Sequence, residues 1–301
     1  MCKTFFPYFL FCFLFFSLCG SPLILDLYKG ELLSSIQFID DLSQVDLVYI
    51  GETHTIKRHH YLQESLLESL VNRGRQPILA VEALEYPSQN ILEHYNAKEL
   101  SFDELVEKLD WKRTWSNYKD YSSLFALTVE HNGSVVAINA PLKQVRSMAR
   151  NGIEAAKPLP EPFHTKEPLY EKWLKLVLQV HMRFDPNRLE RIILAQMLRD
   201  EVMAQKIEER LKNKKKEEII VVIIGKGHIS HGMGTVQRVR WRYPEVRDRV
   251  VLQTNSGDLT LSNEDKKEMR DLTITHENFR FLERPLADYQ IIHLPENDEL
   301  P

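Results

Sequence analysis

Short apolar runs alternate with amphipathic stretches along most of this chain of 301 residues. The runs are rich in Val, Ile and Leu and lack polar alternation, whereas apolar residues in the stretches between them recur every three or four positions. Strands that are apolar on both faces and alternate with helices are typical of a parallel sheet covered on both sides. The pattern therefore predicts an α/β fold with a mostly parallel central sheet flanked by helices.

The boundaries of these runs give the expected order of elements. Strands are predicted over residues 45–52, 76–83, 134–141, 218–228, 249–254 and 289–294. Helices are predicted over residues 59–74, 86–96, 102–109, 118–133, 169–184 and 188–214, and the last two form a helical insertion between about residues 142 and 217. The length is compatible with one domain, which we place at residues 23–300, with no assignment for the part after about residue 240.

The first twenty residues differ from the rest. Lys3 precedes an apolar run at residues 5–18, which predicts a signal peptide over residues 1–18 and is short for a membrane span. All three cysteines lie here, Cys2, Cys12 and Cys19, so the body of the chain has no disulfide. Cys19 resembles the lipid-modified first residue of a mature bacterial lipoprotein, although Leu18 is bulkier than usual before that cysteine. An exported, membrane-anchored lipoprotein on the periplasmic or cell-surface side is expected, with an uncleaved N-terminal anchor as the alternative.

Composition and charge exclude few classes of protein. With 43% hydrophobic residues, 27% charged residues and a net charge of -4, the chain is ordinary for a globular protein. This charge gives no electrostatic reason to expect a nucleic-acid partner. The basic run at residues 210–218 is interpreted as the solvated end of a helix.

Ionisable side chains stand at the ends of three predicted strands. The motifs "GETH" at residues 51–54 and "GKGH" at residues 225–228 both end in a histidine, His54 and His228; Glu52 lies in the first motif and Glu82 within the second strand. The carboxyl ends of parallel strands meet at one sheet edge, so these side chains could share a crevice. Glu and His together suit general acid–base chemistry or the binding of a divalent metal. The sequence has neither a His-Glu-x-x-His zinc motif nor a nucleophile elbow that would decide between them, so both interpretations stay open.

Four further polar residues are weaker candidates. His59 shares a helical face with the leucines of residues 59–74, which favours a structural role as much as a functional one, whereas His60 points toward the mouth of the crevice. Arg199 and Asp200 lie on a strip beside the apolar face of the helix at residues 188–214. Judged from the residues alone, this pair is most simply read as surface charge.

Five segments in this order carry a resemblance to a known family. They are "IGETHTIKRHHYLQ", "AVEALEYPSQNIL", "WKRTWSNYKDYSSLFALTVEHNGSVVAINAP", "LAQMLRDEVMAQKI" and "VVIIGKGHISHGMG". Over about residues 45–239 the chain resembles the ChaN-type haem-binding uptake proteins of the TIKI superfamily. The paired Gly-x-x-His motifs and Glu82 match the conserved positions of the superfamily, and Arg199 and Asp200 match an Arg-Asp pair in the ChaN helix.

The resemblance implies a haem-binding protein of haem or iron uptake, with an outer-membrane haem receptor as a partner. In the family's characterised mode two haems stack at a ligand-promoted homodimer interface, each iron held by a tyrosine and the propionates met by His and Lys. Tyr118 and Tyr121 are the first candidates for this ligand and Tyr86 the next, and the resemblance adds His59, His60, Arg199 and Asp200 as haem-site residues. Covalent attachment is excluded because no Cys-x-x-Cys-His motif occurs.

The superfamily also includes metal-dependent proteases and erythromycin esterases, which implies a hydrolase as the alternative. There Glu52 would polarise a water molecule, His54 and His228 would orient it or bind a divalent metal, and Glu82 would complete the site. A third possibility is a lipid-anchored structural or adhesive surface protein, but this function does not explain the repeated Gly-x-x-His motifs.

Overall fold

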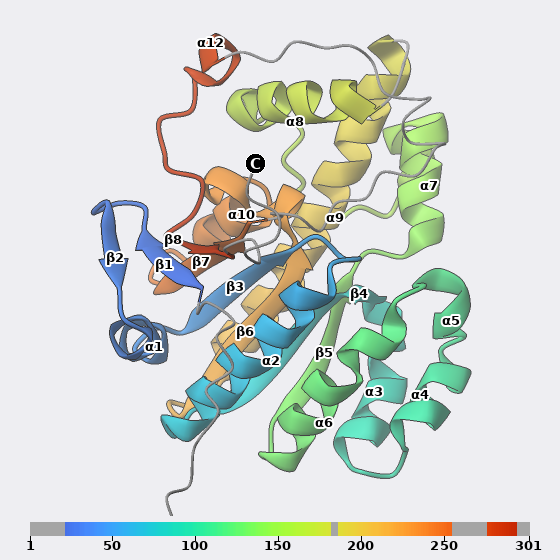
Figure 1. Ribbon diagram of the computed structural model, residues 1–301. Helices are drawn as coiled ribbons and strands as arrows, with labels where there is room; N and C mark the ends of the chain where they lie inside the picture. Colours follow the sequence, from blue (N-terminus) through green and yellow to red (C-terminus); the bar gives the residue numbers. More distant parts are fainter. Residues whose placement is uncertain (1–21, 182–185, 255–275, 294–301) are drawn as a thin grey trace, which may run out of the picture.

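An eight-stranded sheet forms the centre of the protein (Figure 1). The computed structural model describes residues 22–181, 186–254 and 276–293. The strands are β1 (Leu23–Asp26), β2 (Glu31–Leu33), β3 (Leu47–Glu52), β4 (Gln76–Glu85), β5 (Ser134–Asn139), β6 (Glu218–Gly225), β7 (Asp248–Gln253) and β8 (Tyr289–Ile292). Their order is β2-β1-β8-β7-β3-β6-β4-β5, and β8, β7, β3, β6, β4 and β5 run parallel, which confirms the predicted α/β class.

Helices cover both faces of this sheet. They are α1 (Ser35–Ser43), α2 (Lys57–Asn72), α3 (Gln89–Asn96), α4 (Phe102–Lys108), α5 (Trp111–Thr114), α6 (Ser122–Glu130), α7 (Leu142–Asn151), α8 (Pro168–His181), α9 (Pro186–Asn213), α10 (Thr235–Arg242) and α12 (His276–Phe279). Short 3-10 turns are η1 (Tyr86–Ser88), η2 (Tyr118–Tyr121), η3 (Ile153–Ala156), η4 (Lys226–His228) and η5 (Ser230–Gly232).

The apolar residues of the central strands divide between two cores because successive side chains of a strand point to opposite faces. Val48 and Ile50 of β3 pack into the core under α1, α2, α3, α4 and α6. Leu47 and Tyr49 of the same strand face α9 and α10. All six residues of β3 are buried, so the strand is apolar on both faces, as the absence of polar alternation predicts.

The first and the last strand of the described residues pair at one side of the sheet. β1 pairs antiparallel with both β2 and β8, and β7 lies directly beside β3. The part after residue 240, which had no domain assignment, thus supplies β7 and β8 to the sheet, close to the strands predicted at residues 249–254 and 289–294. The antiparallel hairpin β1–β2 is not among the predicted strands because each strand is too short to show a pattern.

One predicted strand and one predicted helix do not run as expected. The strand predicted at residues 218–228 stops at Gly225, whose N–H donates to Glu82 Oε2 (2.6 Å) instead of continuing a ladder, and η4 follows. The helix predicted at residues 118–133 is divided into η2 and α6, because Tyr121 at the junction points inward to a buried carboxylate.

The predicted helical insertion lies between β5 and β6 and consists of α7, η3, α8 and α9. The second half of α9 packs on the sheet through Met203 and Ile207, whereas its first half contacts α8 through Ile193, so that α8 stands beyond the sheet in Figure 1. Among the described residues no helix is both long and apolar enough to cross a membrane. The predicted signal peptide and Cys19 lie outside the described residues.

Candidate functional site

The end of β3 places a buried carboxylate among four polar side chains. Glu52 is 2% exposed, and its Oε1 accepts hydrogen bonds from His54 Nδ1 (2.7 Å) and from the Tyr121 hydroxyl (2.6 Å). Gln63 donates to Oε2, and His60 Nδ1 lies 3.7 Å from the same oxygen. Burial alone would raise the pKa of Glu52, but the hydrogen bond and charge of His54, with His60 and Tyr121, lower it below the ordinary value. Glu52 is therefore held as a carboxylate.

The second carboxylate lies where β4 loses its register with β5. Pairing is interrupted between Val81 and Glu85, and within this irregularity Glu82 is turned toward the strand ends. Its backbone carbonyl accepts from Asn139 Nδ2 (2.9 Å), while its side chain accepts from the Gly225 N–H and from the Arg199 guanidinium. Burial opposes ionisation, but the charges of His228 and Arg199 hold the pKa of Glu82 well below its usual range.

The third part of the site joins η4 to α9. His228 Nδ1 lies 2.6 Å from Asp200 Oδ1, and His228 Nε2 lies 3.4 Å from Glu82 Oε1. Asp200 is fully buried and also accepts from the hydroxyls of Tyr170 (2.6 Å) and Thr235 (2.9 Å). Burial would lower the pKa of His228, but the charges of Glu82 and Asp200 raise it to about 9. An imidazolium therefore bridges two carboxylates at neutral pH.

A close backbone approach connects these groups. A Cβ atom at Gly225 would lie 3.1 Å from His54 Nε2 and 3.3 Å from Glu82 Oε2. Glycine at this position lets the end of β6 approach both side chains, which explains the first residue of the second Gly-x-x-His motif. The structure thus brings together, as one polar cluster, Glu52, His54, His60, Glu82, Arg199, Asp200 and His228.

His59 does not belong to this cluster. Its Nδ1 accepts from the Thr53 N–H (3.0 Å), so the proton is on Nε2, which donates to the Thr254 carbonyl (3.2 Å). Burial lowers the pKa of His59 to about 4, and the side chain is 1% exposed. His59 is therefore a neutral side chain that links the end of β3 to the end of β7.

The three candidate tyrosines lie in different environments. Tyr121 is 1% exposed and its hydroxyl is used inside the polar cluster, so in this structure it is not accessible as an iron ligand. Tyr118 is half-buried against Trp111, with ring centroids 6.3 Å apart. Tyr86 is 37% exposed and lies under the Lys206 ammonium, 5.0 Å from its ring centroid. Tyr86 is thus the most accessible of the three.

Several residues of the site were not singled out as candidates from the sequence. They are Gln63, Asn139, Tyr170 and Thr235. Gln63 lies on α2 three residues after His60, so helical spacing could have indicated it. Tyr170 and Thr235 come from α8 and α10 and have no signal in their local sequence.

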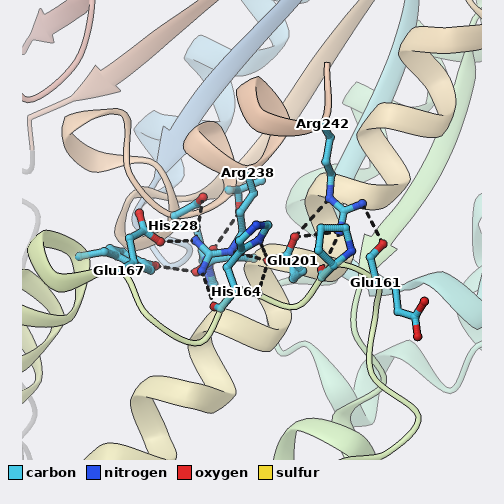
Figure 2. Close-up of polar contacts among 12 residues, drawn as sticks. Glu161, His164, Glu167, Glu201, His228, Arg238 and Arg242 are labelled. Atoms are coloured by element: carbon cyan, nitrogen blue, oxygen red, sulfur yellow. Dashed lines mark hydrogen bonds and ion pairs between the residues drawn. The ribbon is translucent and has the colours of Figure 1, made fainter. Parts of the chain in front are cut away.

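A buried charge network around Glu201 adjoins His228 of the site (Figure 2). Arg238 is fully buried and pairs with Glu201 Oε2 (3.0 Å) and Glu167 Oε2 (2.7 Å), and Arg242 pairs with Glu201 Oε1 (2.8 Å). His164 Nδ1 lies 3.1 Å from Glu201 Oε2. These contacts fasten residues 161–167 to α9 and α10, and so fix the loop that leads to Tyr170.

The polar cluster does not form an evident metal site. In the ranges 22–181, 186–254 and 276–293 no group of three or more His, Cys, Asp or Glu side chains is arranged to hold a metal ion. The carboxylates instead bind Arg199, imidazole and backbone N–H groups. Both nitrogens of His228 are likewise engaged, since Nδ1 lies 2.6 Å from Asp200 Oδ1 and Nε2 lies 3.4 Å from Glu82 Oε1.

Comparison with known proteins places the chain in a family. ChaN of Campylobacter jejuni, whose structure is described as showing cofacial haem binding, superimposes with a TM-score of 0.67 at 19% identity over 92% of this chain and 98% of that one. A mutant of the erythromycin esterase EreC in its open conformation gives a TM-score of 0.46 at 14% identity over 77% of this chain and 76% of its own; a score this low supports no functional comparison. No functionally curated protein matches the sequence. The model of the family "haem-binding uptake, Tiki superfamily, ChaN" matches residues 38–239, more than half of the chain, and the protein therefore belongs to this family.

Proposed function

We propose that this protein is an exported haem-binding protein that acts in haem or iron uptake. The observation that carries the proposal is the family match, because a haem-binding uptake family covers residues 38–239, more than half of the chain. The solved ChaN protein of the same fold is described as binding haem cofacially. Haem stacked in this way would join two copies of the chain, so haem-promoted dimerisation is part of the proposal.

The residues present suit ferric haem. A phenolate oxygen is a ligand that ferric haem iron takes, and the described surface offers exposed phenols at Tyr86, Tyr61 and Tyr28. Haem also carries two propionates, which pair with Lys or Arg side chains. Bound haem would supply the iron that is transported, and the chain would supply the ligand oxygen, the cations and the apolar walls.

The proposal extends to the membrane and to a receptor. Cys19 would be lipid-modified and would hold the protein at the periplasmic or cell-surface side, close to an outer-membrane haem receptor. Metabolic labelling with a palmitate analogue tests the anchor: we expect label in the native chain and none in Cys19→Ser. Equal labelling of the two chains would refute lipidation at Cys19.

A haemin titration of the full-length chain in mild detergent tests haem binding directly. We expect a saturable Soret band and, in analytical ultracentrifugation, a shift from monomer to dimer as haemin is added. The double variant Glu52→Gln/His228→Gln should bind haemin with an affinity within roughly threefold of the native chain, because the polar cluster is buried away from the exposed tyrosines. No saturable binding by the native chain would overturn the proposed function. Loss of binding in a double variant that keeps the native circular-dichroism spectrum would instead place haem at the polar cluster.

Hydrolysis is a second candidate function, which one feature of the polar cluster favours. The side chain of His54 is 34% exposed, and its Nδ1 is fixed by Glu52, so that its Nε2 faces the strand ends. Burial opposes the charge, but the hydrogen bond that His54 donates to Glu52 and the charge of Glu82 raise the pKa of His54 above 6.5. An oriented imidazolium can serve as a general acid. Assays with chromogenic esters and peptides, with and without divalent metal ions, test this function: His54→Gln should abolish any turnover, and turnover that survives would exclude His54.

A further inference from the structure

The hairpin β1–β2 carries an apolar face that belongs to neither core of the sheet. The hairpin lies at one edge of the sheet, on the opposite side from α3, α4 and α5 (Figure 1). Leu25 and Leu32 are direct partners across its two strands, and Leu23 is the partner of Ile292 on β8. Side chains two residues apart on a strand share a face, as do direct partners on neighbouring strands. These four side chains therefore form one strip across three strands, which we call the edge strip.

The two faces of the hairpin differ in burial. Ile24 and Ile291 are part of the core under α1 and α2, and Leu33 packs against it. On the other face Leu32 is 62% exposed and Leu23 is 39% exposed, and the other two members of the edge strip are half-buried. The core under α9 and α10 takes side chains from β3, β4, β5, β6 and β7 and, among the described residues, none from the hairpin strands. The edge strip is thus left in partial contact with solvent.

Exposed apolar side chains are concentrated in this part of the chain. Tyr28, in the turn between β1 and β2, is 64% exposed, and Ile36, in the first turn of α1, is 66% exposed. Of the nine large apolar side chains that are exposed in the described ranges, four therefore fall within residues 23–36. A group of this kind marks a surface that contacts another protein or a lipid bilayer. A tyrosine at its margin suits a bilayer, where the ring meets the acyl chains and the hydroxyl meets the headgroups.

The segment that precedes β1 favours the bilayer. The apolar run at residues 5–18 and Cys19, the proposed point of membrane attachment, end four residues before Leu23. Four residues of fully extended chain span at most about 14 Å. An N-terminus attached to a membrane therefore keeps the edge strip beside the lipid, where even a weak apolar contact forms because the attachment raises the effective concentration.

Charge does not provide the attraction here. Residues 23–36 contain one cation, Lys29, which pairs with Asp26 at 3.3 Å, and one further anion, Glu31. Attraction to anionic headgroups requires a surplus of Lys or Arg side chains, which this surface lacks. Contact with lipid should therefore depend on apolar area and be insensitive to lipid charge and to salt.

Pairing with a strand of another protein suits this edge less well. β2 has a free backbone edge, and such edges can accept a further strand. The strand is only three residues long and begins with the exposed Glu31, and short, charged edge strands oppose pairing. The apolar side chains lie on the face of the hairpin, and a bilayer covers a face without needing any backbone partner.

We propose that the edge strip, together with Tyr28 and Ile36, rests on the surface of the bilayer to which the N-terminus is attached. The inference rests on the membrane attachment within the proposed function and adds the face of the protein that meets the lipid. It also orients the protein, because the sheet edge at β2 then faces the membrane and the edge at β5, with α3, α4 and α5, faces away from it.

Photolabelling from inside the bilayer tests this orientation. The full-length chain, purified from membranes, is reconstituted in phosphatidylcholine vesicles that carry a diazirine on the acyl chains, and the sites of carbene attachment are mapped by mass spectrometry. We expect label on residues 22–36 and only background label on Tyr61, which is 68% exposed on α2. Phosphatidylglycerol in the vesicles or high salt should leave this label unchanged.

Two substitutions of exposed leucines distinguish the edge strip from the rest of the surface. Leu32→Asp should lower the label on residues 22–36 by roughly threefold or more, because a carboxylate is excluded from the acyl region. The matched control Leu169→Asp replaces a leucine that is 51% exposed on α8 and should leave the label at the native level. Circular dichroism checks that both variants keep the native fold.

The outcomes separate the attachment from the face. If the native chain does not float with the vesicles in a density gradient, the proposed attachment and this inference both fail. If it floats but residues 22–36 carry no label, the attachment stands and the edge strip is not the contact face. Equal label in the native chain and in Leu32→Asp would also overturn the inference, since the label would then follow from nearness to the attachment point alone. Label that appears only with anionic lipid would replace apolar contact with an electrostatic one and refute the inference as stated.

Discussion

Removal of the buried imidazolium of His228 should change both the stability of the protein and its dependence on pH. His228 lies between Asp200 (2.6 Å) and Glu82 (3.4 Å), and these charges raise its pKa from 6.5 to about 9. Each pKa unit corresponds to about 1.4 kcal/mol, so the protonated form stabilises the fold by about 3 kcal/mol relative to the neutral form. This contribution is complete below pH 6.5, declines between pH 6.5 and 9, and is absent above pH 9, because the folded-state pKa is the higher one.

Urea unfolding of the native chain and of His228→Gln, at about pH 6 and about pH 9.5, measures this contribution. At the lower pH the variant leaves two buried carboxylates without their shared cation, and we expect a loss of about 3–5 kcal/mol. At the higher pH the native histidine is itself neutral, so the difference should shrink by about 3 kcal/mol. The control His131→Gln replaces an exposed histidine after α6 and should follow the native profile. A stability difference between native and His228→Gln that does not change with pH would refute the reasoning.

Three further substitutions probe the contacts around the site. Gly225→Ala should lower the free energy of unfolding in urea by about 1–3 kcal/mol, because the added Cβ would crowd the side chains of His54 and Glu82. In the control Gly227→Ala the added Cβ meets open space, and the free energy of unfolding should stay within about 0.5 kcal/mol of the native value. Equal effects of the two substitutions would contradict the close approach at Gly225. Tyr121→Phe removes a 2.6 Å hydrogen bond to a buried carboxylate and should cost about 1.5–3 kcal/mol by the same assay, and an unchanged midpoint would show that this bond contributes nothing. Glu201→Gln removes the carboxylate that Arg238 and Arg242 share, and should lower the free energy of unfolding by about 3–5 kcal/mol. The variant should also be cleaved by protease near residues 161–167. Resistance to cleavage equal to that of the native chain would exclude a role of Glu201 in holding this loop.

The polar cluster and the exposed tyrosines make separate demands on the fold. The cluster is built from the ends of β3, β4 and β6 together with α2 and α9, and all of its side chains except His54 and Arg199 are buried. Substitutions in the cluster should therefore act first on stability or turnover, and substitutions of exposed tyrosines on haem affinity. This contrast makes the two candidate functions separable by experiment.

The sequence by itself determined the fold class and indicated the strand-end members of the polar cluster. Runs such as residues 45–52 and 218–225 are apolar on both faces, and only a sheet covered on both sides buries them. Because parallel strands end at one edge, Glu52, Glu82 and His228 were expected to be able to share one crevice. These conclusions need only the local periodicity of the chain and the general geometry of parallel sheets.

The tertiary structure alone decided which polar residues are partners and which are accessible. His59 and His60 are adjacent in sequence, yet one bonds backbone groups of two loops and the other faces the Glu52 carboxylate. Asp200 looked like a surface charge and is fully buried, because α8 and α10 pack over it from distant parts of the chain. Tyr121 and Tyr86 could not be distinguished as ligands until burial was known. Such differences depend on contacts between residues far apart in sequence, and the local sequence pattern does not predict those contacts.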